Sequence, residues 1–381
     1  VVVGDVDVDA IEAQIKKLFA DVPAQPDAAK REYYPVNDNK EPIVLIARDK
    51  EQPHIQAIIF NKHEATPDSE KGNMDYLIQD YAIDLINNML NARLNELLQA
   101  ANPPYIYAGT YDGDFFVAKT KQAFTGIVVC KEDAVENGIT TLVREMERAR
   151  RFGFTESEYQ RARAEYLRNL ESAYNERDKR KNDEYINEYV RHFLDNEPIP
   201  GIENEYGIIS QIAPSIPVEP LNMMMQTLVT DTNQVVAIFG PEKENLKMPT
   251  EDAIKKILHD VKAEELAPYV DKVSDEPLMK ETPKGGKIIS EQKDDVFGTT
   301  MLTLSNGVII KKTDFKADEI IMKGVSLGGS SLFPDSEIIN INGLDAVSVG
   351  GLGNFSTVDL EKILAGKRAS VGYGIGDKTE S

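Results

Sequence analysis

The chain has 381 residues and a formal net charge of −21, with 64 acidic residues against 43 basic ones. This acidic excess argues against a nucleic-acid-binding surface and against attraction to anionic lipid. The 41% hydrophobic and 28% charged residues are typical of a globular protein, and no stretch approaches the roughly 20 apolar residues that a transmembrane helix needs. Cys130 is the single cysteine, so an intrachain disulfide framework is excluded.

The first residues predict a strand followed by a helix. Val1–Val3 form a β-branched run, and Ile11 and Ile15 lie at helical spacing after Gly4. A similar strand, turn and helix is predicted over 235–258. Each unit leads into a polar, proline-bearing stretch, so we interpret the pair as an internal repeat in which each unit closes a domain. The alternative is chance similarity between two common units.

The middle of the chain predicts strands first and helices later. Strands are expected over 42–48, 55–61, 105–111, 115–119 and 124–130, with a turn at Asp112-Gly113-Asp114 and a long helix over 73–100. Further helices are expected over 134–152, 155–196 and 221–229. Gly153 stops the first of these, and a capping box of Thr155 and Glu158 opens the second. This order of elements predicts an α+β fold with mostly antiparallel sheets and helices packed on one face.

Two features of these helices have structural interpretations. The charge run of the 155–196 helix is typical of a solvated face. Met223-Met224-Met225 is typical of core filling rather than of a ligand set.

The last segment begins another set of elements. Met301–Leu304 and Val308–Lys312 flank Ser305-Asn306-Gly307, which predicts a hairpin. A third strand is expected over 318–327. Ser356 or Thr357 is expected to cap a helix over 358–364.

The sequence offers no catalytic or metal-binding constellation. Its four histidines are His54, His63, His192 and His259, and none has another within four residues. His63-Glu64-Ala65-Thr66-Pro67 fails as a zinc motif because proline takes the second histidine position, so His63 is expected in a loop. Cys130 is expected in the core. The glycines at 372, 374 and 376 precede no helix that would make them a nucleotide loop. We therefore assign no catalytic, cofactor-binding or metal-binding residue.

Several stretches resemble the pitrilysin/insulinase family of zinc metallopeptidases, also called inverzincins. Val1–Asp7 with its following helix resembles the end of that family's catalytic domain. The long helix with Leu90–Leu94 resembles the second domain. Leu304–Val308 with Lys311 and Lys312, and then Val325–Pro334, resemble the opening of the third. The likeness is strongest to the large single-chain members from Bacteroides-like bacteria.

The resemblance implies the domain boundaries. Residues 1–24 would be the terminal strand and helix of a truncated catalytic domain, and residues 25–40 a linker. Residues 41–267 would form a complete second domain, residues 268–297 another linker, and residues 298–381 the start of a truncated third domain. The exposed edges of the truncated domains would then favour a homodimer.

The resemblance also implies a function. The parent protein would hydrolyse peptides in an enclosed chamber, with zinc held by an H-x-x-E-H motif. That motif is absent from this sequence, so the zinc-binding body is expected upstream of Val1. The fragment would be inactive chamber wall without its own cofactor, and the family suggests a periplasmic or exported location. The alternative is a non-catalytic binding or assembly module related to the core subunits of respiratory complexes.

Overall fold

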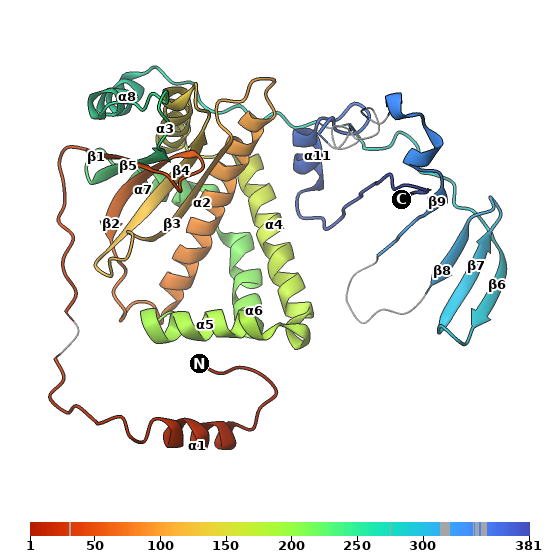
Figure 1. The fold of residues 1–381 in the computed structure, drawn as a ribbon, viewed down its shortest axis with the longest axis horizontal. Helices are drawn as coiled ribbons and strands as arrows, with labels where there is room; N and C mark the ends of the chain where they lie inside the picture. Colours follow the sequence, from red (N-terminus) through yellow and green to blue (C-terminus); the bar gives the residue numbers. More distant parts are fainter. Residues whose placement is uncertain (30–31, 275, 313–320, 338, 340–342, 344–348) are drawn as a thin grey trace. The chain divides into compact units, whose positions relative to one another are not determined.

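A computed structural model of the chain describes residues 1–29, 32–274, 276–312, 321–337, 339, 343 and 349–381. The chain divides into two compact units (Figure 1). The first comprises residues 1–170 and 179–271, and the second comprises residues 171–178 and 272–381. In the part of the chain that the structure describes, no helix combines the length and the apolar character needed to cross a membrane.

The first unit is built on a five-stranded sheet with the order β1–β5–β2–β4–β3. Its strands are β1 (Ile43–Asp49), β2 (Ile55–Glu64), β3 (Tyr107–Asp114), β4 (Lys121–Cys130) and β5 (Gln234–Pro241). Only β1 and β5 pair in parallel, and they are separated by most of the unit's sequence. This sheet confirms the predicted α+β class with mostly antiparallel pairing.

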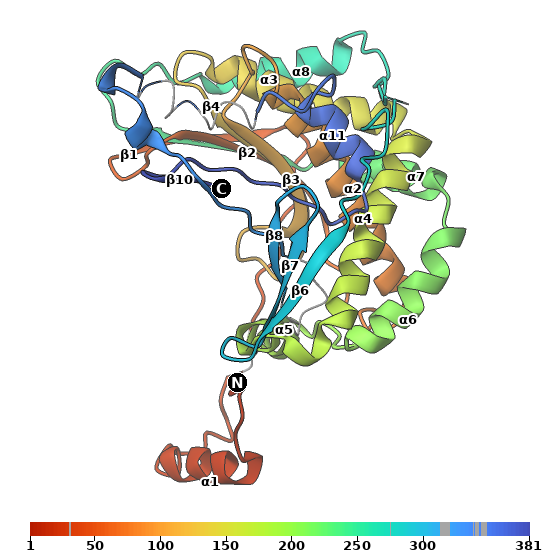
Figure 2. The same cartoon turned by 90° about the vertical axis from the view of Figure 1, so that its right-hand side faces the viewer.

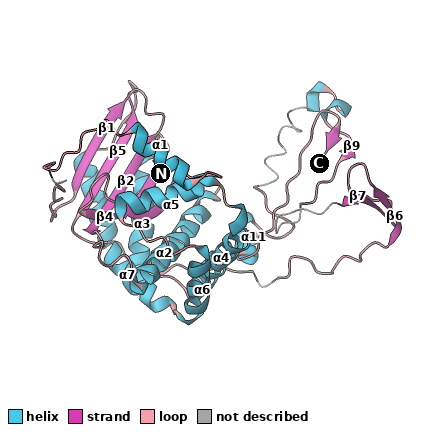
Figure 3. Cartoon of the chain, turned by 90° about the horizontal axis from the view of Figure 1, so that it is seen from below, coloured by secondary structure: helices cyan, strands magenta, loops and turns pink. Residues whose placement is uncertain are grey.

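Helices of the first unit pack on one face of this sheet (Figure 3). They are α2 (Met74–Leu98), α3 (Val135–Phe152), α4 (Glu156–Asn175), α6 (Ile202–Ile212), α7 (Val218–Leu228) and α8 (Glu251–Ala263), with the short 3-10 turn η2 (Ala213–Ser215). The last residues of α4 and most of the 3-10 turn η1 (Arg177–Lys179) are assigned to the second unit. Helix α8 lies alongside α3 (Figures 1 and 2). Two other helices, α1 (Val8–Leu18) and α5 (Asn182–Asp195), contain no buried residue.

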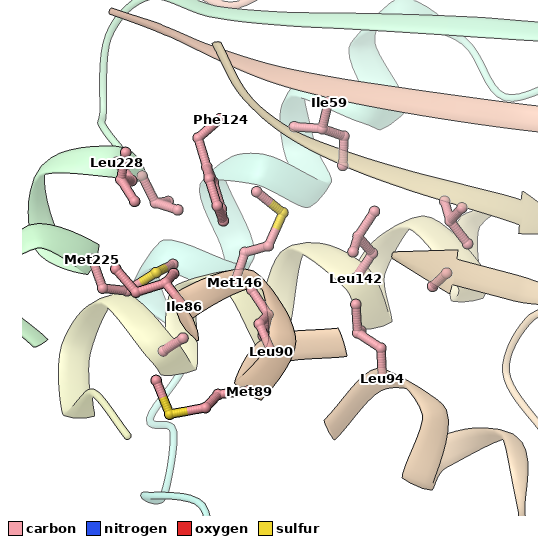
Figure 4. Close-up of a cluster of buried hydrophobic side chains, with 14 of the residues drawn as sticks. Ile59, Ile86, Met89, Leu90, Leu94, Phe124, Leu142, Met146, Met225 and Leu228 are labelled. Atoms are coloured by element: carbon pink, nitrogen blue, oxygen red, sulfur yellow. The ribbon is translucent and has the colours of Figure 1, made fainter. Parts of the chain in front are cut away.

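The core lies between the sheet and α2, α3 and α7 (Figure 4). Helix α2 begins where the Asn73 side chain accepts a hydrogen bond from Tyr76 N, and it is buried on several sides. The side chains labelled in the close-up are all buried: Ile59, Ile86, Met89, Leu90, Leu94, Phe124, Leu142, Met146, Met225 and Leu228. Met225 is therefore core, as predicted for its methionine run, whereas Met223 is 61% exposed.

The C-terminal end of the first unit is tied to α3 and α4 by arginines. We call residues 264–271 the clasp. Arg148 Nη1 donates to the Ala267 carbonyl at 2.8 Å, and Arg161 pairs with the buried Asp271 carboxylate at 2.8 Å. The compact unit therefore continues to Asp271. The boundary at residue 267 and the other domain limits remain predictions.

The predicted turn at Asp112-Gly113-Asp114 is wrong. β3 runs through all three residues, which pair with β4, and the chain reverses over residues 115–120. The rings of Phe115 and Phe116 pack on Phe60 at 5.2 and 4.7 Å between centroids. These contacts and the cross-strand pairing outweigh the local turn preference of an Asp-Gly sequence.

The predicted single helix over 155–196 is also wrong, because it divides into α4, η1 and α5. The capping box at its start is confirmed, with Thr155 N donating to Glu158 Oε2 at 2.8 Å and Glu158 N to Thr155 Oγ1 at 3.3 Å. The helix breaks over residues 176–181, which contain no apolar side chain. A helix without an apolar face gains little from packing, and this lets the chain turn there. The sequence analysis also missed α6.

Val1–Val3 form no strand among the described residues. A β-branched run becomes a strand only beside another strand, and none pairs with it here. The helix predicted after Gly4 is confirmed as α1, which is capped by Asp7. The second predicted strand–turn–helix unit is confirmed as β5 followed by α8.

The second unit contains a three-stranded meander and short elements. The strands are β6 (Ile288–Asp294), β7 (Thr299–Leu304) and β8 (Ile309–Lys312), with β9 (Ser326–Leu327) and β10 (Thr379–Glu380) paired separately. The turns η3 (Ser330–Leu332) and η4 (Asp335–Glu337) precede α11 (Thr357–Leu364). The β7–β8 hairpin and the Ser356 cap of α11 confirm the predictions.

Strand β6 was not predicted, because its residues do not alternate between apolar and polar. Residues 318–320 of the predicted third strand lie outside the described residues. The remainder forms only β9, because Gly324 interrupts its apolar run.

Candidate functional site

The four histidines lie on separate elements of the fold. His54 is exposed before β2, His192 lies in the last turn of α5, and His259 is 81% exposed on α8. Within the described ranges, no group of three or more histidine, cysteine, aspartate or glutamate side chains is placed to hold a metal ion. Cys130 is 1% exposed, as predicted, and burial raises the pKa of its thiol to about 12. It is therefore not a nucleophile at neutral pH.

The prediction that His63 lies in a loop is wrong, because it lies in β2. Its Nε2 is 2.8 Å from Asp112 Oδ1 on β3, and its Nδ1 is 3.1 Å from the Glu64 carbonyl oxygen. Burial opposes protonation of His63, but the Asp112 carboxylate outweighs it and raises the pKa of the imidazole. Both ring nitrogens are occupied by protein partners, so this pair is structural.

An acidic stripe runs along α2. Asp80 and Asp84 are one turn apart on this helix. The carboxylates of Glu197 and Asp112 repel the negative charge of Asp80, and the carboxylate of Glu205 repels that of Asp84. Both aspartates are exposed, so their carboxylates keep part of their hydration. Loss of hydration is the main cause that raises the pKa of Asp80 to about 7, and its negative neighbours add to the effect.

This shift predicts a pH dependence of stability. Because the pKa of Asp80 is raised from 3.8 to about 7, the folded chain binds its proton more tightly than the unfolded chain does. The free energy of unfolding therefore falls as pH rises through this interval and stays lower above it. We expect Asp80→Asn to raise that free energy at pH 8 and to leave it nearly unchanged at pH 4, as measured by urea unfolding.

The matched control is Glu70→Gln, which changes an exposed carboxyl just before α2. It should have the same small effect at both pH values. An equal gain from Asp80→Asn at pH 4 and pH 8, or a loss at pH 8, would contradict the assignment.

A further candidate surface is the other face of the sheet, which we call the open face. Its apolar cluster consists of strand residues and the β3–β4 loop, without a contribution from any helix that the structure describes. Ile43 and Leu45 on β1 are 51% and 53% exposed, and Tyr107 and Tyr111 on β3 are 53% and 43% exposed. These side chains lie on one face because alternate strand residues point the same way. The open face is thus broad, apolar and partly aromatic.

The β3–β4 loop adds an aromatic tip to the open face. Phe116 has a φ of 53°, which is unusual for a bulky residue, and its side chain is 54% exposed. Its packing against Phe60 and Phe115 holds this conformation. Sequence analysis missed the open face, although the alternation of Tyr107, Gly109 and Tyr111 was a signal for it.

A small cavity lies on the helical side, lined by residues that include Ile59, Asn61, Glu147 and Gln234. Its volume of about 20 Å³ is room for a single water molecule and for no substrate. The buried Oε1 atom of Gln234 has no hydrogen-bond partner among the described residues. Because this cavity is too small for a substrate, the open face is the better candidate for contact with a large ligand.

The geometry defines an α+β domain with one helical face and one open apolar face. Residues 1–166 match the protein family described as Peptidase M16 inactive domain. Residues 1–166 are thus similar to an M16 peptidase domain of the inactive type, and the resemblance of the chain to the pitrilysin/insulinase family is confirmed.

Individual relatives agree with this assignment. The chain is 31% identical over 210 residues to a protein named Zinc protease PQQL-like from Arabidopsis thaliana, which covers 55% of this chain and 22% of that protein. It therefore spans about a fifth of the length of that curated relative.

Solved structures share the fold. The periplasmic protease PqqL from Escherichia coli matches with a TM-score of 0.59 and 20% identity, over 99% of this chain and 41% of that one. The ferredoxin protease FusC, solved in complex with Arabidopsis ferredoxin, matches with a TM-score of 0.56 and 15% identity, over 99% and 42% of the two chains.

Proposed function

We propose that this chain is part of a longer zinc-dependent peptidase, in which it acts as inactive scaffold and chamber wall. The observation that carries the proposal is the match of residues 1–166 to the inactive M16 domain, together with a relative named as a zinc protease. The apolar open face supports a role in contacting unfolded peptide, since such peptides expose apolar side chains that folded proteins bury.

The residues that the structure describes do not fit a zinc site. The four histidines lie on separate elements, and the sequence has no H-x-x-E-H motif. A peptidase zinc site needs three protein ligands that converge on one ion. In the proposed function, zinc and the general base therefore belong to another part of the longer protein, and no residue of this chain takes part in bond cleavage.

The test uses the full-length gene product and a quenched fluorescent peptide. We expect hydrolysis that is abolished by a chelator and by replacing the glutamate of an upstream H-x-x-E-H motif with glutamine. Residues 1–381 alone should not cleave the peptide. A full-length protein that has no such motif and no activity would overturn the proposal and favour the binding or assembly module.

The wall role has its own test in the active full-length protein. We expect Leu45→Ser and Tyr107→Ser together to raise KM several-fold with little change in kcat, because they change binding without touching the reacting atoms. Met223→Ser is the matched control, since Met223 is an exposed apolar residue on α7. Unchanged KM in the double variant would remove the wall role and leave the peptidase assignment standing.

Three finer proposals accompany this function. We propose that residues 41–267 form an autonomous folding unit between linkers at 25–40 and 268–297. Limited proteolysis should cut these linkers first, at residues outside the latch and the clasp. We propose an exported or periplasmic location, which is supported by the name of the solved PqqL protease.

We also propose self-association through the edges of the end segments. A strictly monomeric chain in sedimentation over a wide concentration range would exclude it.

A further inference from the structure

Residues 34–39 cross the end of the sheet where β2 ends and β4 begins. We call this segment the latch. Lys62 on β2 and Lys121 on β4 are 4% and 5% exposed, and both turn toward it. Lys62 Nζ donates to the Asn37 carbonyl oxygen at 2.7 Å, and Lys121 Nζ lies 2.9 Å from Asp38 Oδ1. Two buried ammonium groups on neighbouring strands thus hold the middle of the latch.

Neutral hydrogen bonds hold its two ends. Thr120 Oγ1 donates to the Tyr34 carbonyl oxygen at 3.1 Å and accepts from Val36 N at 3.3 Å. At the other end, Asn39 N donates to Asn233 Oδ1 and Asn233 N donates to the Asn39 carbonyl oxygen, both at 2.8 Å. The whole attachment is therefore polar.

Apolar burial contributes little to this attachment. No residue of the latch is fully buried, and the side chain of Asp38 is 65% exposed. Lys121 also pairs with Glu64, whose side chain is 80% exposed, so its buried charge keeps a partner if Asp38 leaves. A segment with few buried apolar contacts opens at low cost in free energy. The contacts of the two lysines, and not the burial of apolar side chains, therefore determine whether the latch stays attached to the sheet.

The latch also connects the sheet to the residues that precede it, and we call the described residues before Tyr34 the N-terminal arm. Among the described residues before Tyr34, none is hydrogen-bonded or ion-paired to the sheet or to α2–α8. Helix α1 has no buried residue, and Ile15 and Leu18 remain 45% and 76% exposed. Release of the latch would therefore leave the described residues of the arm without a hydrogen bond or ion pair to these elements.

We propose that residues 34–39 are a releasable latch, held by Lys121 and Lys62, that fixes the direction in which the N-terminal arm leaves the sheet. Because Lys62 shares the strand face of Phe60 and Ile58, the latch lies over the end of the open face. When the latch detaches, this end of the open face becomes accessible to solvent. The N-terminal arm then has a second conformational state, in which its direction is no longer fixed. This inference does not depend on the peptidase function.

The experiment is amide hydrogen exchange of the full chain, followed at Val36 and Asn39, whose amides are hydrogen-bonded within the latch attachment. Lys121→Met is expected to speed their exchange at least tenfold. Asp38→Asn should do the same to a smaller degree, and its exposed position ensures that the fold survives. Raising NaCl from 0.05 to 1 M should speed exchange in the wild type, since salt weakens the exposed half of the ion pair.

Lys119→Met is the matched control, because Lys119 is a neighbouring lysine that pairs with Asp114 and Asp195. It should leave the exchange of Val36 and Asn39 unchanged. Unchanged exchange in both Lys121→Met and Asp38→Asn would overturn the proposal, since the neutral bonds alone would then hold the segment. Equal acceleration throughout β2 and β4 in Asp38→Asn would also overturn it, because the effect would then be general loosening of the sheet.

Discussion

Replacing Arg93 with methionine is expected to lower the free energy of unfolding of the first unit by about 3–5 kcal/mol. Arg93 on α2 is 2% exposed, and its Nε and Nη2 atoms bind the two Glu158 carboxylate oxygens at 2.6 and 2.9 Å. Nη2 also donates to the Gly153 carbonyl oxygen at 2.9 Å. Methionine would leave a buried carboxylate without its counter-ion and a carbonyl without its donor, and these losses set the size of the effect.

Arg93 also joins the clasp to the core. Its guanidinium lies between the rings of Phe154 and Tyr269, 4.7 and 4.4 Å from their centroids. Glu158 in turn belongs to the capping box of α4. One side chain therefore connects α2, the start of α4 and the end of the unit. We expect the loss to be seen as faster amide exchange across α2 and α4 together.

The control for this prediction is Lys256→Met on α8, which breaks an exposed ion pair with Asp260. It should cost less than about 0.5 kcal/mol. Adding Glu158→Gln to Arg93→Met should recover part of the loss, because the unpaired buried charge is removed while a capping side chain stays. If Arg93→Met lowers the free energy of unfolding by less than about 1 kcal/mol, the prediction is wrong, and water reaches the carboxylate of Glu158.

Elements with a strong local pattern could be predicted from the sequence. The apolar spacing of α2, the stop of α3 at Gly153 and the Asn-Gly hairpin of β7 and β8 depend on neighbouring residues only. The β3–β4 turn could not be predicted in the same way. Its position depends on Phe60, which lies on another strand and packs against Phe115 and Phe116.

The candidate surfaces depend even more on contacts that are distant in sequence. Arg93 and Glu158 are 65 residues apart, and the sequence analysis treated Glu158 only as a helix cap. Lys62 and Lys121 meet the latch only because β2 and β4 pair. The open face required the strand order, since Leu45 and Tyr107 lie on opposite edges of the sheet. A local pattern cannot specify which strands are neighbours.

Gly153 is the site of the second large expected effect. It stops α3 with φ 67° and ψ −156°, a region that only glycine occupies readily. A Cβ atom there would lie 2.4 Å from Cγ of Asn222. That asparagine cannot move away freely, because its side chain accepts from Phe154 N at 2.7 Å and donates to the Phe154 carbonyl oxygen at 3.1 Å. We expect Gly153→Ala to cost about 3 kcal/mol, from backbone strain and loss of this clamp.

Two other glycines separate the two causes. Gly201 has a φ of 74° but only a Glu203 side-chain oxygen at 3.8 Å from its built Cβ, so Gly201→Ala should show the strain alone. Gly72 has neither a positive φ nor a neighbour within 4 Å, so Gly72→Ala should change stability by less than about 0.5 kcal/mol. If Gly153→Ala costs no more free energy of unfolding than Gly201→Ala in urea, the Asn222 side chain moves aside without destabilising the fold, and its two hydrogen bonds to Phe154 contribute nothing to stability. If Gly153→Ala costs more than Gly201→Ala, and Asn222→Ala alone costs nearly as much as Gly153→Ala, the difference comes from the two hydrogen bonds that fix Phe154 at the junction of α3 and α4.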